Sequence, residues 1–292
     1  IRVSGCDLQR NRFTRELEKK GCRITYSHNP DHLEGVDMLV YSSAVPPETP
    51  EIAAAVRKGI PVYQRAIYTL MLMKEKKLVG VSGSHGKTTT TWMIAHSYIN
   101  AGLEPSLMVG GNVPEIYGNF RIGKGEWFIS EVDESDGTIR GISPRIAVIT
   151  NIDDEHMHFY KSRGRLREAF VRFCGNAGAE GTVILCGEDP QTGSIAEEMK
   201  GEVLTYGFSD RFDIFATDIE YRDLCSTFTL HYKGHTCKHI RLRFCGEHNI
   251  LNSLAAFSAA VSGGVAPGTV IESLELCKPV ARRFELSGNR DE

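Results

Sequence analysis

The sequence lacks the features that would place it in a membrane, on nucleic acid or outside the cell. No apolar run approaches the length of a membrane-spanning helix, and no secretory signal opens the chain. The formal net charge is only −3, so no excess of basic residues indicates a nucleic-acid or membrane-surface partner. Repeats and low-complexity segments are also missing. A cytoplasmic protein of about two domains is therefore expected from the 292 residues.

The eight cysteines form no C-x-x-C pair. They are scattered, many within apolar runs, which favours reduced and buried thiols over a disulfide framework. His235, Cys237 and His239 alternate along one segment, so they could share a strand face and bind zinc. A half-exposed strand of mixed residues explains the same pattern equally well, and both interpretations stay open.

The most informative stretch is 83–89, which reads Gly-Ser-His-Gly-Lys-Thr-Thr. It lies between 77–82, an apolar run typical of a buried strand, and 90–99, whose bulky apolar residues recur at helical spacing. Glycines allow successive backbone N–H groups to converge on phosphate oxygens. Lys87 is expected to reach the β- and γ-phosphates and Thr88 to hold Mg²⁺, while the helix N-terminus adds a favourable dipole.

This loop departs from the general phosphate-loop pattern at one position. The pattern requires glycine where the chain has Val81, and the sequence offers Gly80 and Gly83 instead. A glycine turn that merely precedes a helix is the alternative interpretation.

Apolar runs and helical patterns alternate along most of the chain, which predicts an α/β fold. Residues 1–66 are expected to form a partial Rossmann-like domain whose first strand is missing ahead of Ile1. Residues 67–286 are expected to form a P-loop ATPase domain with a mostly parallel sheet plus a small antiparallel sheet, and 287–292 the start of a further domain. Strands are predicted at 2–5, 24–26, 38–41, 61–63, 77–82, 127–132, 146–150, 183–186, 203–206, 214–219, 227–232 and 239–244, and helices at 11–20, 51–58, 67–76, 90–99, 247–262 and 269–276.

Polar side chains follow two predicted core strands, at the edge where ligands collect in open α/β sheets. Glu131 and Asp133 are two apart, so they share a strand face and could present oxygen ligands to Mg²⁺. A solvated acidic loop is the alternative. His156 and His158 follow the next strand and could act as metal ligands or proton shuttles.

Two further features suit a nucleotide. Asn249 and Asn252 lie three apart on one predicted helix face, where amides can read a nucleobase edge. A role for Asn249 as a helix N-cap is the alternative. Arg283, next to Arg282, supplies planar donors suited to phosphate, although paired surface arginines are common.

Taken together, these segments resemble the Mur ligase family of peptidoglycan synthesis. The resemblance covers essentially the whole chain and rests on several motifs in order. These are Tyr41-Ser42-Ser43-Ala44 followed by Pro50-Glu51, Arg65, the loop with His before Gly-Lys-Thr-Thr-Thr, the run 131–136, Thr150-Asn151 followed by His156, and the run 246–252.

The resemblance implies ATP-dependent ligation of L-alanine to UDP-N-acetylmuramate through an acyl-phosphate, in cytoplasmic peptidoglycan precursor synthesis, with ATP and Mg²⁺ as cofactors. It implies no nucleic-acid or membrane partner, and it implies that the C-terminal domain of the family is absent from this chain. Residues 1–66 become the UDP-substrate domain. By resemblance, Lys87 and His156 are catalytic; Gly83, Ser84, His85, Gly86, Lys87, Thr88, Thr89, Asn249, Asn252 and Arg283 bind the nucleotide; Thr88, Glu131 and His156 hold Mg²⁺; and Asp7, Ser42, Ser43 and His85 contact the uridine-nucleotide substrate.

Three alternatives remain open at this point. A related ligase that recycles a murein peptide onto UDP-muramate would carry the same motifs. A P-loop phosphotransferase or NTPase would use the same loop without an amine. A binding module or dinucleotide oxidoreductase could be built on the first domain, although no nicotinamide site stands out.

Overall fold

The computed structural model describes residues 1–42, 44–135 and 137–280. The chain divides into two compact units, Ile1–Lys74 and the described residues from Glu75 onward. Helix α3 (Arg65–Leu72) belongs to the first unit. The functional boundary expected between residues 66 and 67 stays a prediction.

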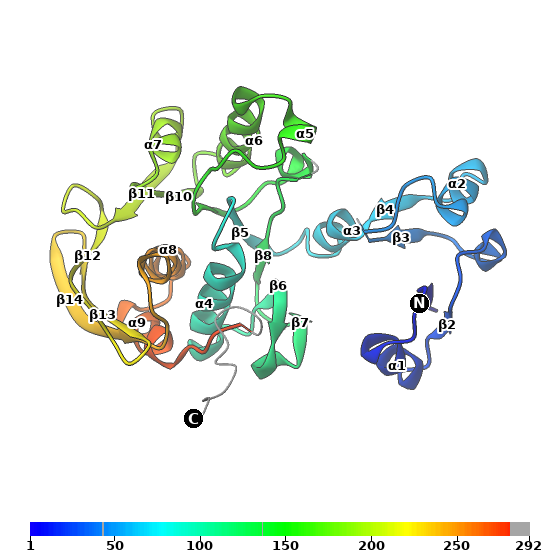
Figure 1. The fold of residues 1–292 in the computed structure, drawn as a ribbon, viewed down its shortest axis with the longest axis horizontal. Coiled ribbons are helices and arrows are strands. Elements are labelled where there is room, and N and C mark those ends of the chain that lie inside the picture. The colour runs from blue at the N-terminus through cyan, green and yellow to red at the C-terminus, as the bar shows by residue number, and fades with distance from the viewer. Residues whose placement is uncertain (43, 136, 281–292) are drawn as a thin grey trace, which may run out of the picture. The chain divides into compact units, whose positions relative to one another are not determined.

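The first unit alternates short strands and helices (Figure 1). Strand β1 pairs with β2 and β3 with β4, all in parallel, so these strands form two separate ladders and not the one small sheet expected. Each strand has three residues, so each ladder makes few hydrogen bonds. The elements are β1 (Ser4–Cys6), α1 (Arg12–Lys19), β2 (Arg23–Thr25), the 3₁₀ turn η1 (Pro30–Leu33), β3 (Leu39–Tyr41), α2 (Pro50–Arg57), β4 (Val62–Gln64) and α3 (Arg65–Leu72).

Local capping explains where the first helices start. The Asn11 side chain accepts hydrogen bonds from the backbone N–H of Phe13 and Thr14, while Thr14 accepts from the Asn11 N–H, so α1 begins with a capping box. Pro50 occupies the first position of α2, where no N–H is needed. The buried core cluster described for this unit is small and contains Leu33, Ala54 and Ala55.

The second unit is built on a ten-stranded sheet in the order β14-β13-β12-β11-β10-β9-β5-β8-β6-β7. Strands from β12 to β6 in this order pair in parallel, whereas β13, β14 and β7 are antiparallel. The antiparallel strands thus extend the parallel sheet. The strands are β5 (Lys77–Ser82), β6 (Ser106–Val113), β7 (Gly118–Arg121), β8 (Trp127–Glu131), β9 (Ile146–Ile149), β10 (Thr182–Cys186), β11 (Glu202–Gly207), β12 (Ile214–Arg222), β13 (Cys225–Tyr232) and β14 (His235–Leu242).

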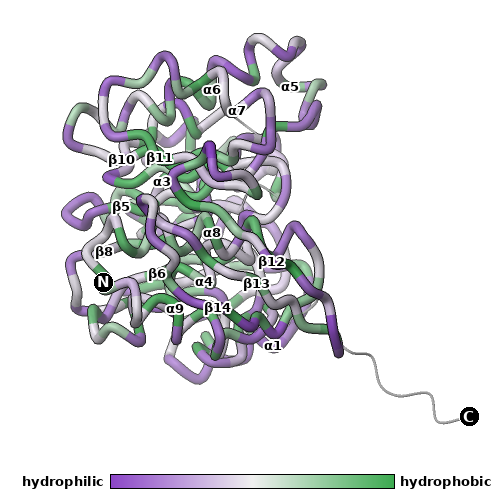
Figure 2. The backbone as a smooth tube through the Cα atoms, turned by 90° about the vertical axis from the view of Figure 1, so that its left-hand side faces the viewer, coloured by the Kyte–Doolittle hydropathy of each residue, from purple (hydrophilic) through white to green (hydrophobic). Residues whose placement is uncertain are grey.

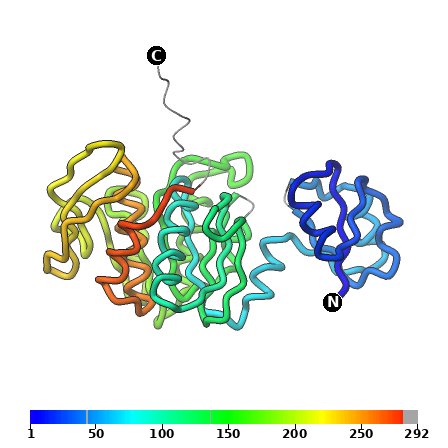
Figure 3. The backbone as a smooth tube through the Cα atoms, turned by 90° about the horizontal axis from the view of Figure 1, so that it is seen from below, coloured from blue at the N-terminus to red at the C-terminus, as the bar shows by residue number. Residues whose placement is uncertain are grey.

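Helices cover both faces of this sheet, as the alternation along β5 shows. Val79 and Val81 are fully buried in the main core with residues of α4 and α8, while a Cβ on Gly80 would lie 2.9 Å from Phe173 Cζ of α6. Helix α9 packs beside α4 and α8 (Figures 1 and 3). The helices are α4 (Lys87–Asn100), α5 (Met157–Tyr160), α6 (Arg163–Gly175), α7 (Pro190–Ala196), α8 (Glu247–Ser262) and α9 (Pro267–Leu276), and the 3₁₀ turns are η2 (Pro114–Ile116) and η3 (Thr138–Gly141).

The mixed α/β fold was predicted correctly, but no ranges were predicted for α5, α6 and α7, and β6 and β7 were missed. The glycines at 110 and 111 interrupt the apolar pattern of β6. Hydrophobic and hydrophilic segments alternate along the tube in Figure 2, as expected where helices turn an apolar face toward a sheet and a polar face away from it. Within the described part of the chain, every helix is too short or too polar to cross a bilayer.

Candidate functional site

The carboxyl ends of three adjacent strands create the site. Strand β5 lies between β8 and β9, and Val81 is in register with Glu131 on one side and Val148 on the other. The segments that follow these strands therefore meet at one sheet edge. They carry the glycine loop, the acidic run and the Thr150–His158 segment that the sequence singled out.

The loop from Gly83 to Gly86 has a backbone that requires glycine at both ends. Gly83 has φ 131°, and a Cβ there would lie 2.3 Å from Thr150 Oγ1. Gly86 caps α4 with φ 82°, and a Cβ there would lie 2.4 Å from Asn252 Oδ1. These are conformations and approaches that side chains do not tolerate. Gly80, by contrast, makes room for Phe173 and is a packing glycine, so it does not replace the loop glycine that the usual pattern has where this chain has Val81.

Thr150 and Asn151 hold this loop in place. The Asn151 side-chain oxygen accepts from the His85 N–H at 2.8 Å, and its amide donates to the His85 carbonyl at 3.1 Å. The Thr150 hydroxyl donates to the same carbonyl at 2.6 Å. One step further, the Asp153 N–H donates to Ser84 Oγ at 2.8 Å. Thr150 and Asn151 were seen in the sequence only as part of a motif, so their positioning role was missed.

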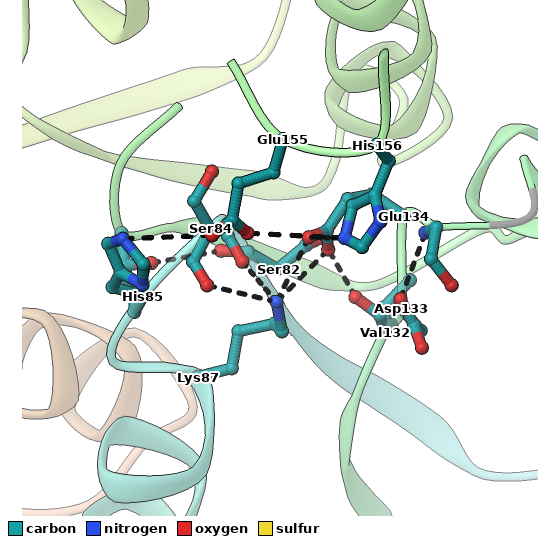
Figure 4. A network of polar contacts seen from close by, with 12 residues as sticks. Ser82, Ser84, His85, Lys87, Val132, Asp133, Glu134, Glu155 and His156 are labelled. Carbon is teal, nitrogen blue, oxygen red and sulfur yellow. Dashed lines mark hydrogen bonds and ion pairs between the residues drawn. The ribbon is translucent and has the colours of Figure 1, made fainter. Parts of the chain in front are cut away.

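Lys87 and Glu134 form the centre of the site (Figure 4). Lys87 Nζ lies 3.0 Å from Glu134 Oε1 and 3.2 Å from Oε2, and it also donates to the carbonyls of Gly83 and Ser84. The Glu134 side chain is 1% exposed. Ser82 Oγ donates to Glu134 Oε2 at 3.4 Å, and the Tyr160 hydroxyl donates to the Glu134 carbonyl. A buried carboxylate needs such donors, because charge that is taken out of water without a partner is costly.

A group of possible metal ligands adjoins this pair. One donor atom each of Asp133, Glu134 and His156 lies within 4.8 Å of the others, and His156 Nε2 is 3.6 Å from Glu134 Oε1. His156 caps α5 with φ 56°, which turns the chain sharply at this point. Two carboxylates supply the oxygen ligands that a hard divalent cation prefers, and such a cation keeps several waters. The donor set therefore fits Mg²⁺.

The other two predicted magnesium ligands lie beside strand β6. Glu131 Oε1 accepts from the Gly110 N–H at 2.5 Å, and a Cβ on Gly110 would lie 2.6 Å from Glu131 Oε2. Thr88 is 7% exposed on α4, and a Cβ on Gly111 would lie 3.3 Å from its methyl group. Neither Thr88 nor Glu131 belongs to the Asp133, Glu134 and His156 group. Sequence analysis had selected Glu131 from the acidic run and missed Glu134, although both follow the same strand.

The two asparagines of α8, Asn249 and Asn252, are both buried. Asn252 Oδ1 accepts from Thr90 Oγ1 at 3.2 Å and lies next to Gly86, while Asn249 Nδ2 donates to the Cys245 carbonyl at 2.9 Å. Helix α8 is capped by Gly246, so the N-cap alternative for Asn249 was wrong.

The remaining residues predicted for the site have the following places. His85 is exposed and lies 3.3 Å from Asp153 and 3.8 Å from Glu155, and half-buried Thr89 is in the first turn of α4. Asp7 accepts from the Gln9 N–H and from the Asn11 side chain, and Ser42 Oγ accepts from the Ala44 N–H. Ser43 and Arg283 lie outside the described residues.

The structure does not assemble the zinc cluster that strand alternation suggested. His235, Cys237 and His239 lie on β14, where His239 contacts Thr229 and the Cys237 thiol faces the His235 carbonyl. Among the described residues, the groups with metal-ligand spacing are at Asp133, Glu134 and His156 and at Cys6, His28 and Glu51. The strand interpretation of the pattern was correct.

Comparisons with known proteins agree with this geometry. Residues 81–260 match the Mur ligase middle domain, and residues 1–77 match the Mur ligase family, catalytic domain. A UDP-N-acetylmuramate–L-alanine ligase of Aquifex aeolicus is 39% identical over 98% of this chain and 63% of its own length. A crystal structure of a UDP-N-acetylmuramate–alanine ligase from Thermotoga maritima superposes with a TM-score of 0.86 at 28% identity, over 99% of this chain and 66% of that one.

A third similarity concerns the fold alone. A Neisseria ligase that joins UDP-N-acetylmuramate to L-alanyl-γ-D-glutamyl-meso-diaminopimelate has a TM-score of 0.84 at 23% identity, over 96% of this chain and 91% of that one. The chain spans somewhat less than two thirds of the Aquifex aeolicus and Thermotoga maritima proteins. Because the middle-domain match alone covers more than half of its residues, the chain belongs to the Mur ligase family.

Proposed function

We propose that the protein carrying this sequence catalyses the ATP-dependent ligation of L-alanine to UDP-N-acetylmuramate in the cytoplasm. The observation that carries the proposal is the convergence of the loop lysine, Lys87, with the Asp133, Glu134 and His156 group at one sheet edge. The names of the curated relatives at 36–40% identity support the choice of substrates.

The reaction proposed has two steps. A carboxylate oxygen of the muramate attacks the γ-phosphorus of ATP, the bond from this phosphorus to the β–γ bridging oxygen breaks, and ADP leaves. The amine nitrogen of alanine then attacks the acyl carbon, the amine loses a proton, and phosphate departs as the C–N bond forms. Both steps depend mainly on positioning and on neutralising charge on phosphate oxygens.

Each predicted residue has a proposed role in these steps. Lys87 exchanges its loop carbonyls and Glu134 for phosphate oxygens and stabilises the transferring phosphoryl group. Thr88 and Glu131 on one side, and His156 with Asp133 and Glu134 on the other, would hold Mg²⁺, which supplies charge neutralisation at the phosphates. Asn249, Asn252 and Arg283 would contact the nucleotide. Asp7, Ser42 and Ser43 would contact the uridine nucleotide, and His85 its muramyl end.

The test measures phosphate release by the full-length protein with ATP and Mg²⁺. Release is expected only when UDP-N-acetylmuramate and L-alanine are both present, and mass spectrometry should detect the alanyl product. Release with the tripeptide L-alanyl-γ-D-glutamyl-meso-diaminopimelate in place of alanine would assign the recycling reaction instead. Release that is indifferent to any amine would indicate an NTPase and overturn the proposal.

A further inference from the structure

The first unit contains a second cluster of polar side chains around a buried glutamate. Glu51, at the start of α2, is 4% exposed. Its Oε2 atom accepts from the Cys6 thiol at 3.1 Å and lies 3.1 Å from His28 Nδ1, and Cys6 Sγ is 3.4 Å from the same His28 nitrogen. His32 Nδ1 lies 2.5 Å from the other oxygen, Oε1.

These residues come from separate segments that the fold brings together. Cys6 ends β1, His28 follows β2, His32 lies in η1, and Glu51 opens α2. Cys6 and His28, the nearest other ligand in the sequence, are 22 residues apart. No local spacing motif therefore predicts the cluster.

The size of the cluster matches a metal site. With zinc–nitrogen and zinc–oxygen bonds of about 2.0 Å and zinc–sulfur bonds of about 2.3 Å, the edges of a tetrahedral site measure about 3.3 to 3.5 Å. The three distances among Cys6 Sγ, His28 Nδ1 and Glu51 Oε2 are 3.1, 3.1 and 3.4 Å. These atoms thus form a triangle close in size to one face of that tetrahedron, and a cation could replace the shared protons with little movement of the chain.

The kinds of donor atom decide which cation the cluster would select. A thiolate and an imidazole are ligands of borderline and soft transition metals, whereas Mg²⁺ and Ca²⁺ take oxygen ligands. We propose that Cys6, His28 and Glu51 bind one zinc-class divalent cation, with a fourth position for water, and that His32 orients the Glu51 carboxylate. Nothing in this proposal depends on the ligase reaction.

The cation would have a structural purpose. It would join the end of β1, the segment before η1 and the start of α2, in a unit whose buried core cluster contains only Leu33, Ala54 and Ala55 among the described residues. Small cores gain most from such a link, and binding energy at a site that only the folded chain assembles adds directly to stability.

The arrangement around the ligands has the second layer that metal sites require. The His32 Nδ1 atom that contacts Glu51 also lies 3.4 Å from the Thr25 hydroxyl, so two contacts at one nitrogen fix the position of this histidine. Without a metal the Cys6 thiol donates to Glu51, and its proton would leave to solvent when the thiolate binds the cation.

The test uses Co²⁺ as a spectroscopic substitute for Zn²⁺. The full-length protein is stripped with a chelator, kept reduced, and titrated with Co²⁺ in excess Mg²⁺, which fills oxygen-rich sites. One equivalent should produce a sulfur-to-cobalt charge-transfer band, and Zn²⁺ should remove it. The Asp133, Glu134 and His156 group contains no sulfur, so it cannot give this band.

Matched variants assign the band to the cluster. Cys6→Ser should abolish it, and Cys22→Ser, which changes another half-buried cysteine of the same unit, should leave it intact. His32→Gln should keep the band but weaken cobalt affinity about 10- to 100-fold, as loss of an orienting partner does. If Cys6→Ser does not fold, His28→Gln serves in its place and should weaken affinity by about 100-fold or more.

Two results would overturn the proposal. One is a stripped wild-type protein that shows no charge-transfer band at stoichiometric Co²⁺. The other is a band that survives in Cys6→Ser or disappears in Cys22→Ser. A melting temperature that rises with Zn²⁺ in the wild type but not in Cys6→Ser would support it independently, because a ligand that binds only the folded state stabilises that state.

Discussion

Two buried glutamates, Glu134 in the second unit and Glu51 in the first, face very different partners. Glu134 is paired with the Lys87 ammonium group and with the Ser82 hydroxyl. Glu51 contacts the Cys6 thiol and two imidazoles. Burial raises the pKa of Glu51, but the hydrogen bonds from these three partners outweigh burial and leave its pKa below the ordinary value.

The difference in partners indicates which kind of ligand each cluster can bind. A lysine that contacts loop carbonyls and a carboxylate can turn its ammonium group toward an arriving phosphate group. The Glu134 cluster therefore suits the binding of a phosphate anion together with a hard metal. A thiol and imidazoles can release protons to solvent and bind a borderline cation in their place, so the Glu51 cluster suits zinc. Each of the following predictions separates the two clusters.

The largest effect is expected from Lys87→Ala. The variant loses the cation that stabilises the transferring phosphoryl group, so turnover of the full-length protein should fall on the order of 10²- to 10³-fold or more. Phosphate release under saturating substrates measures this. The Cys6 cobalt band should not change.

Loss of fold must be separated from loss of chemistry in this variant. Lys87→Ala leaves Glu134, 1% exposed, without its cation, which is destabilising. The double change Lys87→Ala with Glu134→Gln removes both charges and should restore the melting temperature without restoring turnover. Turnover close to the wild type in either variant would remove Lys87 from the mechanism.

The next effect comes from the pair Glu134→Gln and Glu51→Gln. Glu134→Gln removes a charge beside Lys87 and His156, so turnover should fall about 10- to 100-fold and the Mg²⁺ requirement should rise. The cobalt band should remain. Glu51→Gln should remove the band and cost the first unit about 1–3 kcal/mol of stability, because its donors lose a charged acceptor.

Amide hydrogen exchange shows which segments each of these two substitutions destabilises. Faster exchange should appear in β1 and α2 for Glu51→Gln and near the end of β8 for Glu134→Gln. If Glu134→Gln abolished the cobalt band, or if Glu51→Gln changed the Mg²⁺ requirement, the two clusters would not be chemically distinct.

The contrast also shows what the sequence could reveal. The place of the Glu134 cluster was predicted, although Glu134 itself was not. The glycine loop and the acidic run directly follow strands, His156 lies a few residues beyond a third, and parallel strands end at one edge. Within the acidic run the choice between Glu131 and Glu134 could not be made. It depends on β6, whose Gly110 N–H binds Glu131. The interrupted apolar pattern of β6 concealed that strand.

The Glu51 cluster could not be foreseen from spacing. Its three proposed metal ligands are 22 to 45 residues apart, and only the packing of η1 and α2 brings them together. Alternation pointed instead to His235, Cys237 and His239, because residues two apart share a strand face. Side chains that share a face need not converge on one point. On β14, His239 contacts Thr229, and the Cys237 thiol faces the His235 carbonyl.

The smallest effects are expected from two glycine substitutions, one in the phosphate loop and one in strand β5 before it. Gly83→Ala places a methyl group against Thr150 Oγ1 and the Asn151 carbonyl at positive φ, with a strain of about 1–3 kcal/mol. ATP affinity should therefore fall about 10- to 100-fold. Gly80→Ala, three residues earlier, crowds the side chains of Phe173 and Val132 and should cost about 1–3 kcal/mol of stability with ATP affinity nearly unchanged.

Calorimetric titration with ATP and thermal melts measure both variants, and the cobalt band of the Glu51 cluster should be the same in each. The two expected outcomes differ because the two methyl groups meet different atoms. At Gly83 these are atoms of the segment that holds the loop, whereas at Gly80 they are side-chain atoms of Phe173 on α6 and of Val132 just after β8. If Gly80→Ala weakened ATP binding as much as Gly83→Ala, the loop would depend on general packing beneath β5 and not on the Thr150–Asn151 contacts.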